Sequence, residues 1–237
     1  MVEENVRRLL LDELDPSAGA CTVIIARLVD APADATASPE DLLTLVHHAL
    51  ESGDVPIGPI EYADAPIDYS LRSHVPVATI TVGGADGPTT MKLALALGTG
   101  GCVGIGGALM GHLPHAVAPA APGALLLPDL EAALAELVVY TRERARLLDY
   151  TGAVRCAMEV HSDWPLVPCT IDAETGGTVE GEPFTDFGVV RFDYTADMTA
   201  TQLEPVIYEA ARQVALRFGV DEPQFLTPPR TTSTTCT

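Results

Sequence analysis

Positive charge is scarce in this sequence. It contains 13 Lys and Arg residues against 33 Asp and Glu residues, so its formal net charge at pH 7 is −20. Affinity for DNA and RNA comes chiefly from cations that replace phosphate counterions, and this excess of acid therefore argues against nucleic acid as a partner. The same sign disfavours an anionic membrane surface. We interpret the acidity as a solvated shell, with adaptation to high salt as a second interpretation.

Lysine is almost absent, because Lys92 is the single lysine beside 12 arginines. Together with abundant Ala, Val, Leu and Thr, this usage is typical of a GC-rich genome, and we expect a bacterial source.

Cysteine is sparse and irregularly spaced. The five cysteines form no CxxC pair, which argues against a zinc ribbon and against a disulfide framework. Residues 1–15 carry acids on both sides of Arg7 and Arg8 and no uncharged apolar run, so they do not resemble a secretory or transit peptide. We therefore expect a cytoplasmic protein that needs no metal and no cofactor.

The fraction of charged residues is low enough for the chain to fold. The sequence is 47% hydrophobic and 19% charged, which is too apolar for a disordered acidic segment. Its length of 237 residues fits one domain or two small ones.

Helical periodicity and terminal signals predict four helices. The clearest begins at Ser38-Pro39-Glu40-Asp41, where Ser38 is the expected N-cap and Gly53 the expected end. A capping box of Thr201 and Glu204 is expected to start the last helix. The other two helices are predicted over 2–14 and 128–148, and strands over 21–29 and 187–194.

Two segments, 66–87 and 155–176, share a pattern of strand, Ser-x-x-Pro corner, strand and Gly-containing turn. The pattern predicts two β-hairpins, each followed later by a helix, either as diverged ββ(β)α units or as unrelated hairpins. Antiparallel hairpins flanked by amphipathic helices indicate the α+β class. We expect an N-terminal unit over 1–115, a C-terminal unit over 125–226 and a disordered Thr-rich tail over 227–237, with a single domain over 1–226 as the alternative.

Residues 93–128 contain no Asp, Glu, Lys or Arg. A membrane helix over 93–111 is disfavoured, because its glycines destabilise a helix interior. A phosphate-binding loop over 98–107 would use the backbone of its glycines, but it lacks the GxxxxGK[ST] and GxGxxG patterns. We favour a buried strand, a Gly-rich turn and a second buried strand. The glycines that would serve a ligand are Gly100, Gly101, Gly104, Gly106 and Gly107.

The candidate acid–base groups are few. His161 and Asp163 lie beside the single tryptophan at a predicted corner, and His112 and His115 flank Pro114 in a loop. None of them belongs to a recognisable catalytic motif.

Arginines concentrate at the end of the third predicted helix. Arg142, Arg146 and Arg155 are candidates to bind an anionic group, although cations at a helix C-terminus also offset the helix dipole.

We expect a non-catalytic binding or accessory protein, adaptor-like or chaperone-like, that contacts another protein or a second copy of itself. The alternative is an enzyme, or a sensor of a nucleotide or other small-molecule ligand, that uses loop 98–107 with nearby His and Arg residues. It requires His161, His112 and an arginine from 142–155 around one cavity lined by Gly100–Gly107. A second alternative is a membrane-active protein that inserts 93–111.

Overall fold

The computed structural model describes residues 2–32, 35–51, 67–83, 90–108 and 121–229. Four helices are present in these ranges: α1 (Val2–Leu14), α2 (Pro39–Glu51), α3 (Leu127–Leu147) and α4 (Ala200–Arg217). The strands are β1 (Cys21–Leu28), β2 (Ile67–Arg72), β3 (Val75–Gly83), β4 (Thr90–Leu97), β5 (Cys102–Ala108), β6 (Ala124–Leu126), β7 (Ala153–His161), β8 (Val167–Ile171), β9 (Thr178–Glu180) and β10 (Val190–Thr195).

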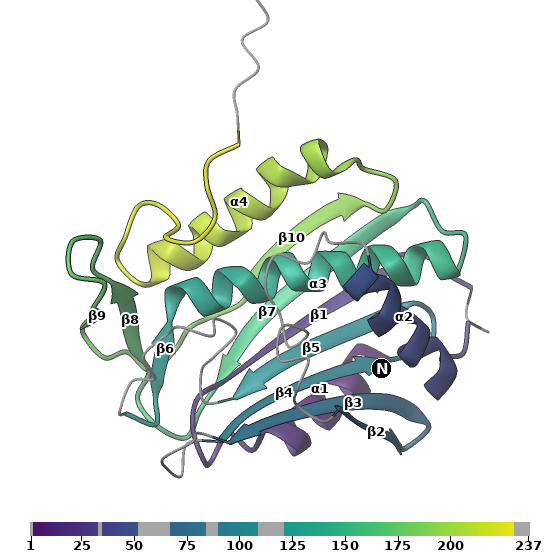
Figure 1. Cartoon of the computed structure of the whole chain (residues 1–237), viewed down its shortest axis with the longest axis horizontal. Coiled ribbons are helices and arrows are strands. Elements are labelled where there is room, and N and C mark those ends of the chain that lie inside the picture. Colours follow the sequence, from purple (N-terminus) through teal and green to yellow (C-terminus); the bar gives the residue numbers. More distant parts are fainter. Residues whose placement is uncertain (1, 33–34, 52–66, 84–89, 109–120, 230–237) are drawn as a thin grey trace, which may run out of the picture.

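Seven strands form one antiparallel sheet in the order β10-β7-β1-β5-β4-β3-β2 (Figure 1). A small second sheet has the order β6-β8-β9, in which β6 and β8 are parallel. The predicted α+β class is thereby confirmed.

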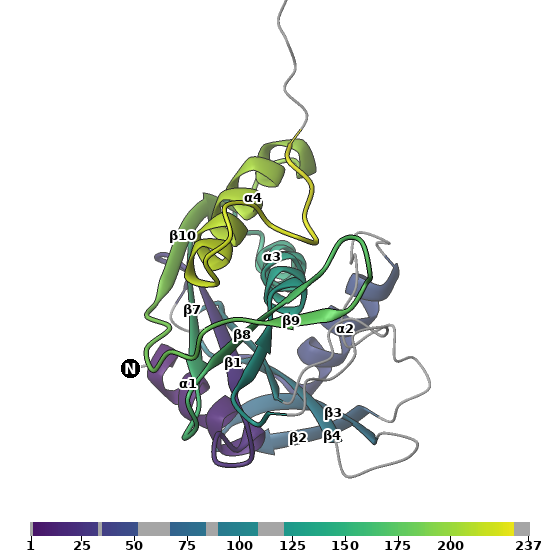
Figure 2. The same cartoon turned by 90° about the vertical axis from the view of Figure 1, so that its left-hand side faces the viewer.

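Helices cover both faces of the large sheet (Figure 2). Because successive side chains of a strand point to opposite faces, Val23 and Ile25 of β1 pack under α1, and Ile24 and Ala26 pack against the core beneath α2, α3 and α4. We call these the α1 face and the α3 face. This alternation decides which charged side chains of β1, β7 and β10 reach solvent.

Residues 93–108 of the uncharged stretch form two buried strands joined by a glycine turn, as expected from the sequence. Gly100 and Gly101 adopt positive φ values of 60° and 72° between β4 and β5, a conformation that side chains disfavour. The membrane helix over 93–111 is therefore wrong for its described residues, since 93–97 and 102–108 are strands. Among the described residues, no helix has the length and hydropathy needed to cross a membrane.

The hairpin predicted over 155–176 is wrong. The β2–β3 hairpin of the first segment forms, but β7 and β8 lie in different sheets. Both sides of β7 are occupied, by β1 and β10, so the chain after the Trp164-Pro165 corner continues into the small sheet. The two segments are therefore not equivalent ββ(β)α units.

Helix α4 begins two residues earlier than predicted. Thr199 and Gln202 form the capping box, in place of Thr201 and Glu204, and Pro205 lies beyond the first turn. Its end at Gly219, which has φ 75°, is as predicted. At α2 the prediction is confirmed, because Ser38 and Asp41 exchange hydrogen bonds of 2.8 and 3.1 Å between side chain and backbone.

The large sheet joins both halves of the sequence. Strand β1 lies between β5 and β7, so a boundary between residues 115 and 125 would divide one continuous sheet. Of the proposed tail, residues 227–229 form no helix or strand, and 230–237 lie outside the described residues, as does Gly53.

Candidate functional site

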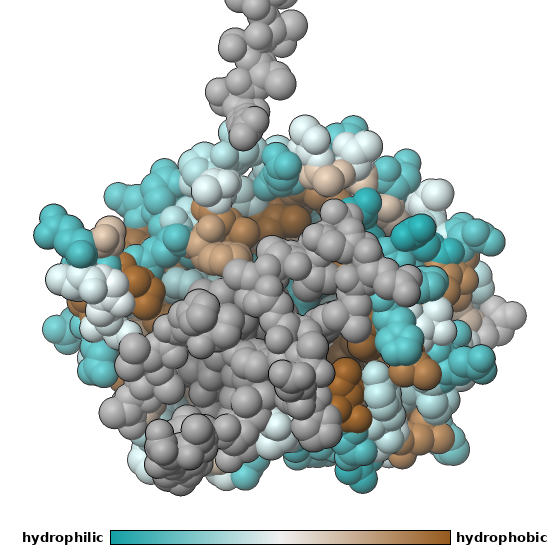
Figure 3. Space-filling model, viewed as in Figure 1, coloured by the Kyte–Doolittle hydropathy of each residue, from teal (hydrophilic) through white to brown (hydrophobic). Residues whose placement is uncertain are grey.

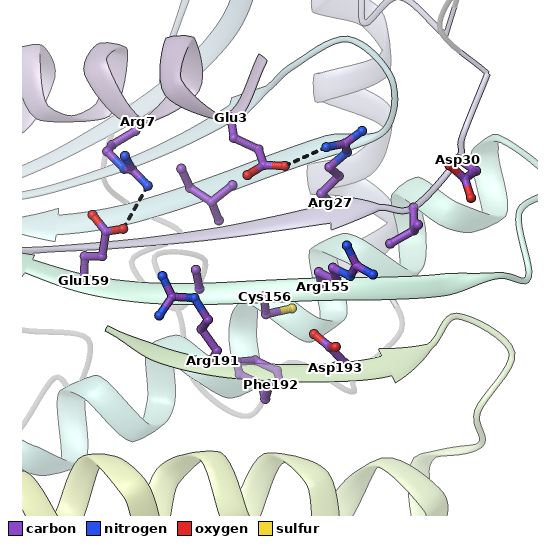
Figure 4. A pocket seen from close by; sticks show the side chains of 13 residues that line it. Glu3, Arg7, Arg27, Asp30, Arg155, Cys156, Glu159, Arg191, Phe192 and Asp193 are labelled. Atoms are coloured by element: carbon purple, nitrogen blue, oxygen red, sulfur yellow. Dashed lines mark hydrogen bonds and ion pairs between the residues drawn. The ribbon is translucent and has the colours of Figure 1, made fainter. Parts of the chain in front are cut away.

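Helix α1 leaves part of its own face of the sheet uncovered. It packs on β1, β4 and β5, and a cavity of about 870 Å³ opens beside it over β1, β7 and β10 (Figure 4). We call this cavity the charged trough, because its lining includes four arginines and four acids. They are Arg7, Arg27, Arg155, Arg191, Glu3, Asp30, Glu159 and Asp193.

The strand register brings these side chains together. Arg27 of β1 lies opposite Arg155 of β7, which in turn lies opposite Asp193 of β10. On the next row Ala157 separates Ile25 from Arg191. The side chains at the intervening positions point to the α3 face and pack in the core. Because side chains alternate between the two faces of a strand, the charged side chains of these strands point to the trough.

Two of the four arginines are neutralised by carboxylates. Arg7 of α1 lies 2.8 Å from Glu159 of β7, and Arg27 lies 3.1 Å from Glu3 of α1. These pairs tie the N-terminal half of α1 to the sheet along one wall of the trough.

The other two arginines are unpaired. Arg155 and Arg191 are exposed, and neither forms a hydrogen bond or ion pair with any residue that the structure describes. Figure 4 shows both side chains extending from the sheet into the trough. Asp193 faces Arg155 in the register without bonding to it, and the neighbour of Arg155 on the other side is the like-charged Arg27. Asp30 and Asp193 also line the trough, but neither forms an ion pair with these two guanidinium groups.

His161 does not line the trough, although its ring contacts one of the trough residues. Its Nε2 lies 3.2 Å from Glu159, the carboxylate that also binds Arg7. Asp163 is exposed, and its backbone N–H donates a hydrogen bond to the carbonyl oxygen of Pro16. Its carboxylate forms no hydrogen bond with His161 in the described structure. Ser162 instead accepts a hydrogen bond from the backbone of Trp164.

A cysteine lies opposite His161, a pairing that the sequence did not reveal. Cys21 occupies that position in the register, but it is fully buried and burial raises the pKa of its thiol to about 12. A thiolate is the reactive form of cysteine, so this pair lacks an activated nucleophile.

The predicted arginine cluster is divided between the two faces. Arg142 and Arg146 belong to α3, on the opposite side of the sheet from the trough, whereas Arg155 lines it. Arg146 is 74% exposed and binds Glu143 at 2.8 Å. Only Arg155 of the three therefore contributes to this site.

The candidate glycines do not line the trough. Gly104 and Gly106 lie in β5 beneath α1, where an added Cβ would come within 2.5 Å of Val6 and 2.6 Å of Leu14, respectively. Gly107 also lies in β5, where it is paired with β1. Gly100 and Gly101 form the β4–β5 turn. His112 and His115 lie outside the described residues. The described members of the proposed catalytic cavity thus do not surround one space.

Searches of known protein families, curated proteins and solved structures found nothing that matches this chain. Within the described ranges, no three His, Cys, Asp or Glu side chains are placed to hold a metal ion.

Sequence reasoning missed Arg7, Arg27, Arg191 and Glu159. The available signal was the alternation in two strands, Arg155-x-Ala157-x-Glu159 and Arg191-x-Asp193, where the charged residues of each strand are separated by an even number of positions and so share one face. Such a pattern predicts one charged face for each strand. It does not say which strands are neighbours.

Proposed function

We propose that this protein is a non-catalytic binding protein, adaptor-like or chaperone-like, whose charged trough receives an acidic segment of a partner protein. The observation that supports it best is the pair of unpaired guanidinium groups, Arg155 and Arg191, on an uncovered face of the sheet. Guanidinium groups bind carboxylates through paired, charge-assisted hydrogen bonds, which are stronger than neutral ones.

The spacing of the two arginines favours two carboxylates of one segment. Arg191 lies opposite Ala157, two residues along β7 from Arg155, so the arginines are diagonal neighbours. Their Cα atoms are then about 7–8 Å apart. Alternate side chains of an extended peptide repeat at about 6.6 Å. An extended segment with acidic residues at positions i and i+2 would therefore match both arginines.

The negative charge of the rest of the protein does not prevent this binding. Charges further apart than the Debye length, about 8 Å at physiological ionic strength, are largely screened. Contact with Arg155 and Arg191 is local, and four arginines balance four acids in the trough lining.

A small anionic ligand is the second candidate. A volume of about 870 Å³ would accommodate one, and the same two arginines would bind it. The competing enzyme proposal has less support, because His161 bonds to Glu159 and the candidate glycines lie elsewhere.

A reducing compartment such as the cytoplasm is consistent with this proposal. Cys21, Cys102, Cys156 and Cys169 are all free thiols buried in the fold. Buried unpaired cysteines are ordinary in reducing compartments, where disulfides are rare.

Fluorescence anisotropy with a labelled peptide of alternating Glu and Ser residues tests the proposal. We expect the peptide to bind the wild type and a Gln-for-Glu peptide not to bind. The double variant Arg155→Gln, Arg191→Gln should lose binding, and the charge-matched control Arg146→Gln, Arg212→Gln should retain it, because these exposed arginines lie on α3 and α4.

Three results would contradict the proposal. The first is no binding to the wild type, and the second is equal loss in both double variants. The third is tighter binding of citrate or inorganic phosphate than of the peptide at the same two arginines, which would favour the small-ligand candidate instead.

A further inference from the structure

The edge of the sheet opposite the trough carries a self-complementary strand. Strand β2 is the last of the seven, and no described strand pairs with its outer side (Figure 1). Tyr69 and Leu71 are 37% and 55% exposed on this strand. In Figure 3, hydrophobic residues reach the surface at the β2–β3 corner of the α3 face. An exposed, partly apolar edge is a template for pairing with another strand.

The β2–β3 turn fixes which backbone groups point outward. Ser73 and His74 both have positive φ, 48° and 69°, as in a two-residue type I′ turn, so Arg72 and Val75 form a hydrogen-bonded pair. Hydrogen bonding alternates along an antiparallel strand. The N–H and C=O groups of Tyr69 and Leu71 therefore point away from β3, toward the open edge.

We propose that two copies of this protein pair through β2, antiparallel, about a two-fold axis at Ser70. This register places Tyr69 opposite the partner's Leu71, and the outward backbone groups of these residues would bond to each other. The same register places Asp68 opposite the partner's Arg72. In this register the outward backbone groups, the exposed apolar side chains and the opposite charges each meet a complementary group of the partner. The interface is isologous, because both copies contribute the same surface, as a two-fold axis requires.

The charged pair is available for this contact. Arg72 is 55% exposed and uses its Nε to bind Glu13 at 3.1 Å. Its terminal nitrogens form no hydrogen bond with the described part of the chain. Asp68 is likewise exposed, and it lies on the same face of β2 as Arg72. Each half of the interface would contribute one Asp–Arg pair.

The dimer is independent of the proposed binding function. Strand β2 and the trough strand β10 are at opposite edges of the sheet, so pairing through β2 leaves the trough of each copy open. Because a six-residue edge strand buries little area, we expect a weak dimer whose population depends on concentration.

Sedimentation velocity of the full chain over a concentration series tests the dimer. We expect the mass to rise from 24.9 kDa toward twice that value. Asp68→Arg should give the monomer, because it opposes the partner's Arg72 with a like charge, and Asp68→Arg combined with Arg72→Asp should restore the dimer. A wild type that stays monomeric, or a dimer that survives Asp68→Arg, would overturn the proposal.

A disulfide cross-link tests the register directly. At the two-fold axis, Ser70 and its symmetry mate form a non-hydrogen-bonded pair with Cα atoms about 4.5 Å apart, which a disulfide can bridge. In a Cys236→Ser background, Ser70→Cys should form a cross-linked dimer under mild oxidation. The control Thr81→Cys, exposed on β3, should not. Equal cross-linking of the two would contradict the register.

Discussion

At the scale of single residues, Glu131 of α3 shows how the C-terminal segment is held. Its carboxylate is fully buried and accepts hydrogen bonds from the backbone N–H groups of Gln224, Phe225 and Leu226 at 2.8, 2.7 and 2.9 Å. Burial raises the pKa of this carboxyl, and the three hydrogen bonds oppose that rise without cancelling it. Desolvation therefore outweighs the stabilisation that the three hydrogen bonds give to the ionised form.

The raised pKa of Glu131 predicts a pH-dependent stability. Between the unfolded and the folded pKa the native state binds more protons than the unfolded one. The stabilising contribution of Glu131 to the free energy of unfolding is therefore fully present below the pKa of the unfolded state. It is lost as the pH rises through the pKa of the folded state. Urea unfolding of the wild type and Glu131→Gln across pH should show their stability difference shifting against the wild type as pH rises. A difference that does not change with pH would contradict this assignment.

The buried cysteines predict that the folded protein does not react with thiol reagents. Burial raises the pKa of Cys21 and Cys102 to about 12, and it also raises the pKa of Cys156 and Cys169. In a Cys236→Ser variant, we expect no reaction with an aromatic disulfide reagent at pH 8 until the protein is unfolded, when four thiols should react. A thiol that reacts at once in the native protein would be inconsistent with this core.

At the scale of elements, the contact between α1 and β5 depends on missing side chains. A Cβ at Gly106 would lie 2.6 Å from Leu14 and 2.8 Å from the backbone oxygen of Thr22. The helix can approach the strand closely because neither Gly104 nor Gly106 has a side chain.

Gly106→Ala should therefore destabilise the fold by about 1–3 kcal/mol, as overpacking does when backbone must shift. The control is Gly177→Ala, whose Cβ would meet only the hydroxyl of Thr175 at 3.3 Å. It should change stability by less than about 0.5 kcal/mol. Chemical denaturation measures both, and equal effects would show that α1 is not packed as described.

The capping box of α4 gives another prediction. Thr199 accepts a hydrogen bond from the backbone of Gln202, so Thr199→Ala should cost about 1 kcal/mol in unfolding free energy. Thr201→Ala is the matched control, because Thr201 is exposed inside the first turn and should change stability little. If Thr201→Ala cost more than Thr199→Ala, the helix would begin where the sequence alone suggested.

Local signals in the sequence predicted most elements and the β2–β3 hairpin, but not which distant strands pair. Ser38 and Asp41 lie within one turn, and their capping could be predicted because it depends on neighbours alone. The trough required Arg27, Arg155 and Asp193 to meet in one row, and these residues are far apart in the chain. Likewise, β8 leaves the large sheet because β10, later in the sequence, occupies the edge of β7. Competition between distant strands leaves no local signal.

At the scale of the whole molecule, the charge of −20 is unevenly distributed. The stretch 93–128 has no Asp, Glu, Lys or Arg, and its residues 93–97 and 102–108 lie in β4 and β5 within the large sheet. Four of the 13 cations line one cavity beside α1, and they come from α1, β1, β7 and β10. The two edges of the sheet thus differ in character, with the trough beside β10 and the self-complementary strand at β2.

Arg155 and Arg191 are the residues that we propose to bind the carboxylates of an acidic segment. The most direct test is an NMR titration of the full chain with the alternating Glu and Ser peptide, which follows arginine side-chain and backbone amide signals. We predict saturable shifts confined to the trough, at Arg155, Ala157, Arg191 and Asp193, and absent with the Gln-for-Glu peptide. Shifts centred on Arg142 and Arg146, or at the β4–β5 glycine turn, would show that the peptide binds elsewhere and would contradict the proposed role of Arg155 and Arg191.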